Sequence, residues 1–505
     1  MMGLNFLTFS DAAKYALVAK NLLSGLGFST TFSFWGNTLF STSGISFVPP
    51  YLISLFMEIF GVGDKPVLYF SMFSYLLLII SIYLLGKKIF GKLVGVLSAL
   101  AIAANVNYID YATSGATEPI FAFEIVFGMY LISLKKKWAT LISLFVLVAM
   151  YFTRPQAFIY VAGLLMYWLI SRFGIKKGSL YFVSMGMAGF IIDKFVILPL
   201  SSKYPLTSIF VRGMQAIFTY SSSTAVSDSL RGAAGSTLGI SEVAKKVFYN
   251  LYNFYKALPD IANPYLWGMF FIGLFHRSKE KLNDSFKLSV LFMLLMTLLV
   301  TALSIPFYRY IHPIIPLVYL VAVETLVFVI TKIFNNKKII ILVSSILILI
   351  LCIGQTLGVL LLDSRFEAKT HNVGKAPVYV ELSKILKNNT DVDQIVVTNL
   401  DTWGSWYGER KTVWFPLETK MLIDEKTGQI PFDAIYLTSY KMDDDNYRMG
   451  EGWRLIFNNP ESPSKWTCDG CAEIAKEFIL KDVYKVSAAD NYERENATGV
   501  LLIKK

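Results

Sequence analysis

The sequence is poor in charged residues, histidine and cysteine. Asp, Glu, Lys and Arg together make up 16% of the 505 residues, whereas a soluble protein carries about 25%. Three histidines and three cysteines leave little material for a histidine-based metal site or a disulfide-rich fold. Because the shortage of charge is concentrated in residues 66–362, it excludes an ordinary soluble enzyme over that part of the chain.

Long apolar runs occupy the region that lacks charge. A helix of roughly 20 apolar residues crosses the ~30 Å hydrocarbon core of a bilayer. We expect ten such spans, at 66–86, 93–109, 119–134, 138–153, 156–172, 180–199, 263–276, 285–304, 311–333 and 338–362. The sequence therefore predicts a polytopic α-helical membrane protein, with residues 66–362 as its transmembrane bundle.

The net charge of +11 follows from lysines and arginines in short turns between these runs. The clusters lie at 87–92, 135–137, 172–177, 277–281 and 332–338. This distribution is the positive-inside pattern, so it predicts cytoplasmic turns and gives no support to nucleic acid binding. Residues 1–65, the loop 200–262 and the segment 363–505 then lie outside the cytoplasm, and we expect a multi-pass protein of the cell membrane.

The external segments show weaker but distinct patterns. Apolar residues at helical spacing between 11 and 26, and an apolar stretch after Pro50, predict amphipathic helices at the membrane interface within residues 1–65. In the loop 200–262 we expect helices near 206–219 and 241–256, joined by a mobile Ser/Gly/Ala-rich link. Residues 363–505 alternate helix-like and strand-like segments and predict a soluble α/β domain, with helices near 376–388, 417–426 and 470–480.

Six short motifs occur in a fixed order along residues 1–330. They are SDAAKYALVAKNLLSGLGFS at 10–29, Pro49-Pro50-Tyr51 leading to Phe60-Gly61, YLLGKKIFG at 83–91, Thr117-Glu118-Pro119, Thr153-Arg154-Pro155, and Arg309-Tyr310 with Pro313 and Pro316. Together they resemble the dolichyl-phosphate-mannose protein mannosyltransferase superfamily, which has the GT-C fold and includes the lipid A aminoarabinose transferases. The second acid that often follows the first in that family is Ala12 here.

The resemblance implies a membrane glycosyltransferase. Such an enzyme moves a hexosyl or pentosyl group from a polyprenyl-phosphate donor to a lipid, glycan or protein acceptor outside the cytoplasm. It implies Asp11 as the base and Glu118 as a second acid, both catalytic, with Arg154 and Arg309 on the phosphate and Tyr15 and Tyr310 as further substrate contacts. It also implies a transmembrane helix ahead of Asp11, so we expect an upstream helix rather than a first span acting as a reverse anchor. The sequence indicates no cofactor and leaves a divalent metal open.

Each of these residues also has a simpler interpretation. Asp11 and Glu118 each suit the first turn of a helix, where the helix dipole favours an acid. Arg154 and Arg309 could place their charges at the membrane surface without binding a ligand. A transporter or flippase for a lipid or glycan is the alternative function, and it would use charges inside the spans, namely Glu124, Asp193, Lys194 and Glu324. A binding protein anchored by the spans is a third interpretation, which would not need ten of them.

Two features of the external domain stay open at this point. Cys468 and Cys471 form a CxxC that could be a redox pair, half of a metal site or a local disulfide, and a structural disulfide is favoured for an exterior domain. Aromatic residues are frequent between 402 and 466; they could stack on sugar rings of an acceptor, although core packing is the commoner role.

Overall fold

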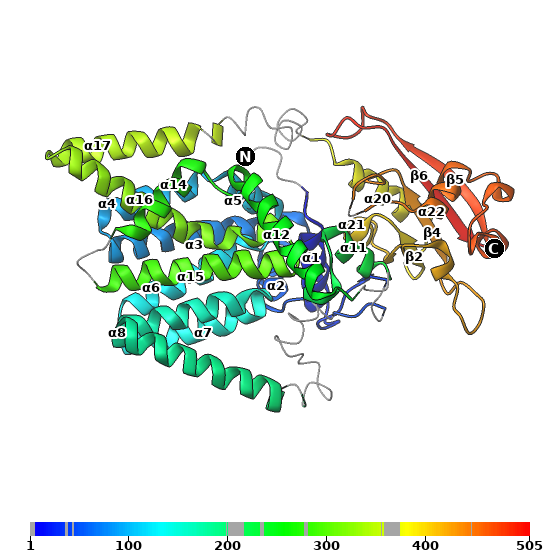
Figure 1. The fold of residues 1–505 in the computed structure, drawn as a ribbon. Coiled ribbons are helices and arrows are strands. Elements are labelled where there is room, and N and C mark those ends of the chain that lie inside the picture. Colours follow the sequence, from blue (N-terminus) through cyan, green and yellow to red (C-terminus); the bar gives the residue numbers. More distant parts are fainter. Residues whose placement is uncertain are drawn as a thin grey trace.

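The structure is a computed structural model. It describes residues 6–35, 39–42, 45–197, 199, 217–232, 237–276, 281–354, 356–357, 374–445 and 447–505. A bundle of apolar helices fills one end of the molecule, and a domain built on a six-stranded sheet fills the other (Figure 1). The fold class predicted from the sequence, a polytopic helical protein with a C-terminal α/β domain, is confirmed.

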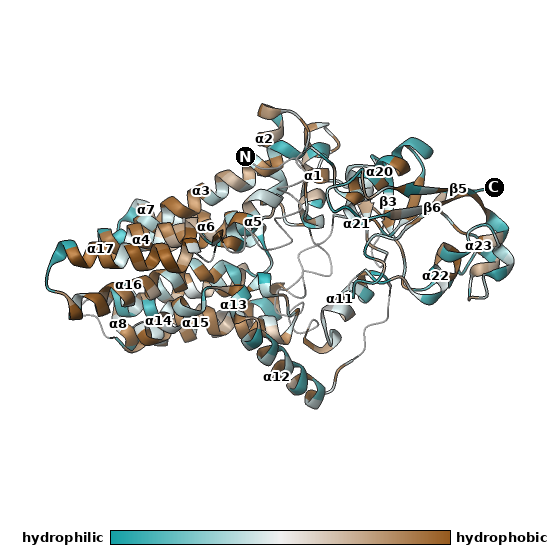
Figure 2. Ribbon diagram, turned by 90° about the horizontal axis from the view of Figure 1, so that it is seen from above, coloured by the Kyte–Doolittle hydropathy of each residue, from teal (hydrophilic) through white to brown (hydrophobic). Residues whose placement is uncertain are grey.

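The bundle consists of helices that coincide with the predicted apolar runs. They are α3 (Asp64–Ile89), α4 (Lys92–Ala103), α5 (Val106–Ser114), α6 (Glu118–Ser133), α7 (Lys137–Thr153), α8 (Ala157–Ile192), α14 (Pro264–Phe275), α15 (Lys281–Leu303), α16 (Ile315–Ile333) and α17 (Lys337–Ile348). Figure 2 shows these helices as predominantly hydrophobic. By length and composition, four helices among the described residues can cross a membrane, or five if α4 and α5 are one span. Part of the predicted span 338–362 lies outside the described residues.

Helix α8 covers nearly all of the predicted span 156–172 and the first part of the span 180–199. Gly174 interrupts it with φ 77° and ψ 168°. A Cβ atom added to Gly178 would lie 2.7 Å from the Cα atom of Ile170, a distance that a straight helix could not give for residues eight apart. The chain therefore turns back at Gly174, and its second arm carries exposed apolar side chains such as Leu180 and Met187, as lipid contact requires.

The predicted span 93–109 is wrong as a single straight helix. Helix α4 ends at Ala103, and α5 starts at Val106 with a bend of 57° between them. Asn105 causes the break, because its side chain accepts a hydrogen bond from the backbone N–H of Tyr108 and so begins a new helix. Residues 110–114, which follow the predicted span, belong to α5 for the same reason.

The basic turns and the sheet domain lie at opposite ends of the bundle. The start of α3 is at the domain end, because Asp64 accepts hydrogen bonds from Trp406 (2.6 Å) and Tyr407 (2.9 Å). The opposite end of α3 carries Lys87 and Lys88 in its last turn. Within the bundle, α3 packs against α4 and α6, α8 packs against α15, and α14 packs against α16.

The described parts of segments 1–65 and 200–262 form helices that lie between the bundle and the domain. They are α1 (Ser10–Leu23), α2 (Val48–Phe60), α11 (Ser223–Leu230), α12 (Ile240–Lys256) and α13 (Leu258–Ile261). Helix α11 lies within the Ser/Gly/Ala-rich link, so part of the segment that was predicted to be mobile is helical instead. The predicted helix 241–256 corresponds to α12, whereas most of 206–219 lies outside the described residues.

The sheet has the order β1-β3-β2-β4-β6-β5. Its strands are β1 (Phe32–Ser33), β2 (Ile395–Thr398), β3 (Lys411–Trp414), β4 (Ala434–Thr438), β5 (Phe478–Val486) and β6 (Ala497–Lys504). The helices of the domain are α20 (Val378–Asn389), α21 (Asp401–Trp406), α22 (Glu451–Asn458) and α23 (Cys471–Glu477). The predicted helix 417–426 is only a short 3₁₀ turn, Thr419–Leu422, and 478–480 belong to β5 rather than to a helix.

Two segments from outside the domain are built into it. Strand β1 pairs in parallel with β3, Phe32 opposite Thr412, so the N-terminal segment supplies the edge of the C-terminal sheet. Arg231, which follows α11, is fully buried and donates to the carbonyl oxygens of Phe415 (3.3 Å), Pro416 (3.4 Å) and Arg448 (2.7 Å). The domain is thereby attached to both external segments of the bundle.

Candidate active site

Asp11 lies in the first turn of α1, at the end of the bundle that faces the domain. Its Oδ2 atom is 3.0 Å from Nη2 of Arg309, which belongs to the 3₁₀ turn Tyr308–Tyr310 that precedes α16. The two side chains are 45% and 29% exposed, respectively. The helix has Phe9 as its N-cap and no side-chain cap, so Asp11 does not act as a capping residue. An accessible carboxylate therefore faces a guanidinium at the end of the bundle that faces the domain.

A second carboxylate–guanidinium pair lies deeper in the bundle. Oε1 of Glu118, the first residue of α6, is 2.8 Å from Nη1 of Arg154, and the two side chains are only 3% and 9% exposed. Arg154 joins α7 to α8 in an extended conformation (φ −151°, ψ 145°), which is the region that Pro155 imposes on the residue before it. Thr117, the N-cap of α6, makes no side-chain capping bond, so Glu118 is held chiefly by its arginine.

Tyr310 connects the two pairs. The guanidinium of Arg154 lies 5.9 Å from the centre of its ring, and that of Arg309 lies 5.6 Å from the same ring. Tyr15, one turn after Asp11, also belongs to the cluster: burial and then the negative charge of Asp11 raise the pKa of Tyr15 to about 12, so it remains a neutral phenol. The structure thus brings together all six residues that the sequence assigned to catalysis and substrate binding.

The field in the cluster keeps Asp11 ionised. Burial on its own would raise the pKa of Asp11, but Arg309, Lys14 and Arg154 outweigh it and hold the pKa below its usual value. Lys14 is a residue that the sequence motifs did not single out; its ammonium group lies 4.7 Å from the centre of the Phe34 ring. Three cations against two carboxylates leave a site that favours an anion such as a phosphate.

The sequence motifs also did not single out His312, which lies behind the cluster. The hydroxyl of Tyr111, on α5, makes a short hydrogen bond with Nδ1 of His312, and the imidazole is buried. His312 comes two residues after Tyr310, so the pair supports the turn that holds Arg309. The sequence offered one signal for it, an isolated histidine beside Pro313 at the start of a predicted span.

The alternatives left open by the sequence fall outside this cluster. Glu124 accepts a hydrogen bond from Thr153 (2.8 Å), and Glu324 pairs with Lys287 (2.9 Å), so these intramembrane acids have separate partners on different helices. Cys468 and Cys471 are joined in a disulfide. The tryptophans between 402 and 466 are buried in the domain core. Within the described ranges, no three His, Cys, Asp or Glu side chains converge as a metal site would require.

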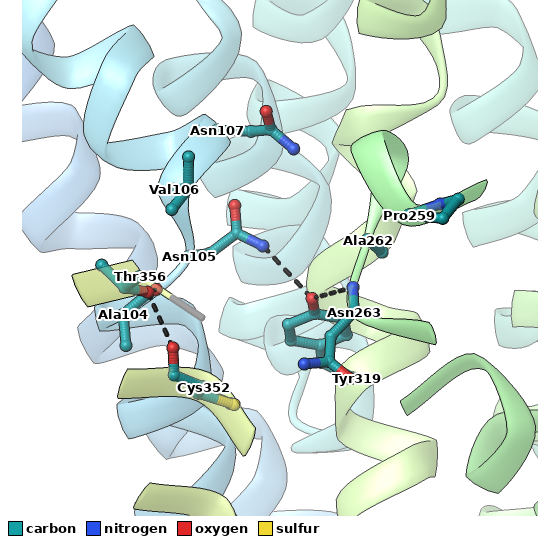
Figure 3. Close-up of a pocket in the computed structure, with 11 residues that line it drawn as sticks. Ala104, Asn105, Val106, Asn107, Pro259, Ala262, Asn263, Tyr319, Cys352 and Thr356 are labelled. Carbon is teal, nitrogen blue, oxygen red and sulfur yellow. Dashed lines mark hydrogen bonds between the residues drawn. The ribbon is translucent and has the colours of Figure 1, made fainter. Parts of the chain in front are cut away.

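A separate cavity lies where α4 and α5 meet α13 and the start of α14 (Figure 3). Its polar lining is neutral, and its members bond to one another: Asn105 Nδ2 donates to the Tyr319 hydroxyl (3.3 Å), and the backbone N–H of Asn263 donates to the same hydroxyl (2.9 Å). Because no Asp, Glu, Lys or Arg lines this cavity, it has no group for acid–base chemistry at a phosphate ester. The charged cluster is the better candidate for an active site.

Comparisons with known proteins agree with the motifs. Residues 45–193 match a family described as dolichyl-phosphate-mannose-protein mannosyltransferase. ArnT from Cupriavidus metallidurans, in the apo state, superposes with a TM-score of 0.54 at 12% identity, over 99% of this chain and 94% of ArnT. The Archaeoglobus fulgidus oligosaccharyltransferase in its apo form gives 0.54 at 11% identity, over 95% and 70% of the two chains. No curated protein matches the sequence.

The same archaeal oligosaccharyltransferase, AglB, has also been solved in complex with an inhibitory peptide and a dolichol-phosphate. That structure superposes with a TM-score of 0.52 at 10% identity, over 90% of this chain and 68% of AglB. At these identities the structural similarity concerns the fold. Together with the family match, it confirms the resemblance found in the sequence motifs.

Proposed function

We propose, on the premise that this chain is a mannosyltransferase-like protein of the GT-C superfamily, that it transfers a sugar from a polyprenyl-phosphate donor to an acceptor hydroxyl. The acceptor is a lipid, glycan or protein on the extracytoplasmic side of the membrane, and the sugar is a hexose or a pentose. The observation that carries this proposal is the convergence of Asp11, Glu118, Arg154 and Arg309 at the outer end of the bundle.

The reaction requires one base and a site for the leaving phosphate. The acceptor oxygen attacks the anomeric carbon of the donor, and the bond from that carbon to the phosphate oxygen breaks. The bonding pair leaves with the polyprenyl phosphate, while the acceptor proton passes to a carboxylate. Cations at the leaving group stabilise the charge that develops on its oxygen. Support for such a donor comes from AglB, which shares the fold and has been solved with a dolichol-phosphate.

Asp11 suits the role of the base better than Glu118. Its side chain is far more exposed, so an acceptor can reach it, whereas Glu118 is almost fully enclosed by the bundle. Its present partner, Arg309, is itself partly exposed and can turn to a phosphate when the donor binds. Glu118 instead keeps Arg154 in place beside the Tyr310 ring, which makes it a positioning residue in this mechanism.

The test is a transfer assay with the purified protein in lipid nanodiscs. Radiolabelled undecaprenyl-phosphate sugars (mannose, glucose, N-acetylglucosamine and arabinose) are offered with a cell-envelope fraction as acceptor, and labelled product is counted. We expect Asp11→Asn to lower transfer at least about 100-fold, the lower end of a general base contribution. The control is Asp260→Asn, an exposed acid on α13 outside the cluster, which should transfer normally. Full transfer by Asp11→Asn would remove this residue from the mechanism.

A further inference from the structure

Asp401 occupies an unusual position at the start of α21, directly after strand β2. It is 5% exposed, and its φ of +52° lies in the left-handed region that residues other than glycine seldom adopt. Its carboxylate accepts hydrogen bonds from its neighbour's backbone, Thr402 N (2.7 Å), and from the Tyr447 hydroxyl (3.2 Å). Strained backbone at a buried acid is typical of a residue with a functional role, so the surroundings of Asp401 are informative.

Helix α21 packs directly on α1, the helix that carries Asp11 (Figure 1). Thr402 Oγ1 donates to the carbonyl of Ser10 (2.7 Å), and Trp403 Nε1 donates to the carbonyl of Leu7 (3.0 Å). The two residues that follow Asp401 are therefore tied to the chain immediately before Asp11. The C-terminal domain has no freedom to move Asp401 away from the cluster without breaking these bonds.

The electrostatic neighbours of Asp401 belong to the site and to one loop of the domain. Asp11 and Lys14 face it from α1, and Lys441 and Tyr447 face it from the loop after β4. Burial, and then the negative charge of Asp11 among other groups, raise the pKa of Asp401, although its hydrogen bonds act in the opposite direction. The charge of Asp401 in turn supports the protonated form of Lys14, which burial disfavours.

We propose that Asp401 is a positioning residue for sugar transfer: the C-terminal domain places this carboxylate behind Asp11 and Lys14, where its negative charge keeps Asp11 an effective base. The inference rests on the proposed function. Arg309, Lys14 and Arg154 make Asp11 a weak base, and a second carboxylate nearby offsets part of their field. Through Asp401, the C-terminal domain thus influences the basicity of Asp11.

The test is the pH dependence of transfer by Asp401→Asn. Asparagine has the same shape and tolerates a positive φ, so the substitution removes mainly the charge. We expect transfer at pH 7 to fall severalfold, and the acidic limb of the pH–rate profile to move down by about one unit, because the residual limb then reports Asp11 alone. In the wild type the acidic limb should follow the ionisation of Asp401, whose pKa is raised. Tyr447→Phe removes a hydrogen bond that stabilises the ionised Asp401, so it should move this limb upward.

Asp64→Asn is the structural comparator. Asp64 also fastens the domain to the bundle, through Trp406 and Tyr407, but it lies on α3 and outside the cluster. We expect this variant to lower the melting temperature and leave the acidic limb in place. Profiles of Asp401→Asn and Tyr447→Phe that superimpose on the wild-type profile would overturn the inference while leaving the proposed function intact.

A wild-type protein that transfers no sugar would instead overturn the proposed function. The interaction between Asp11 and Asp401 can then be measured without substrate by infrared spectroscopy. The carboxyl band of Asp401 is the band that disappears in Asp401→Asn. In the Asp11→Asn variant this band should titrate at a lower pH than in the wild type, because a like charge has been removed. An unchanged titration in that variant would contradict the coupling between Asp11 and Asp401.

Discussion

The buried pair of Glu118 and Arg154 gives the sharpest test of how the site is held together. At 2.8 Å, and with an effective dielectric constant of about 20, their attraction is about 6 kcal/mol before desolvation is subtracted. Removing one partner leaves an uncompensated buried charge, which typically costs about 3–5 kcal/mol. We therefore expect Glu118→Gln and Arg154→Met each to destabilise the protein by about this amount. The double variant should be more stable than either single one, because it buries no charge.

The assay is thermal unfolding in nanodiscs, followed through tryptophan fluorescence, with all variants compared in the same buffer. The matched control is Glu381→Gln, which breaks a pair with Lys384 at the same distance of 2.8 Å. That pair is on the surface of α20 and should contribute less than about 1 kcal/mol. The reasoning is refuted if Glu118→Gln lowers the melting temperature no more than Glu381→Gln does, or if the two single effects simply add in the double variant.

Three further changes probe other parts of the fold. Gly95→Ala should destabilise the protein by about 1–3 kcal/mol, because its Cβ would lie 2.7 Å from the backbone of α3. The control Gly186→Ala meets nothing within 4 Å, so it should be neutral or mildly stabilising in the same melting assay. Arg231→Met removes the donor to the carbonyl oxygens of Phe415 and Arg448, and one of two donors to that of Pro416, which also accepts from Trp453 Nε1. We therefore expect the free energy of unfolding to fall by about 3 kcal/mol, and faster proteolysis of the loop around α11. Replacing Cys468 and Cys471 by serine should lower the free energy of unfolding by only about 2 kcal/mol, because the disulfide closes a very short loop. A larger loss would indicate a role beyond cross-linking.

The sequence predicted the parts of the structure that depend on local patterns. Apolar runs located the helices of the bundle, and basic turns located their ends; even the reversal at Gly174 falls in the turn marked by Arg172 and Lys176. The residues proposed for the site were assigned through the family resemblance of short motifs, and in several of these motifs a helix start or a proline fixes the local conformation. The bend at Asn105 was missed, because one amide in an apolar run does not outweigh the hydropathy around it.

Features that depend on distant contacts could not be read from the sequence. Strand β1 is two residues long and becomes a strand only because β3, about 380 positions later, pairs with it. Lys14 lies within the motif at 10–29 but is not one of the residues to which the resemblance gives a role. Asp401 belongs to no motif, and it gains its place from a left-handed backbone that no local pattern predicts. Long-range pairs of this kind form late and against the entropy of a long loop, so local sequence carries little trace of them.

These distant contacts explain why the external parts of the chain are built as one unit. In the proposed mechanism the carboxylate of Asp11 acts as a base only if the cations around it stay at fixed distances. These cations come from α1, from the α7–α8 connection and from the turn before α16. Helix α1 packs chiefly against α2 and α21 and touches the bundle helix α3 only slightly, so the domain supplies part of its support. The bonds from Trp403 and Thr402 to the chain before Asp11, and the pairing of β1 with β3, supply that support. Because these contacts hold α1 from the side of the domain, the domain preorganises the proposed site even where it contributes no atom to the reaction.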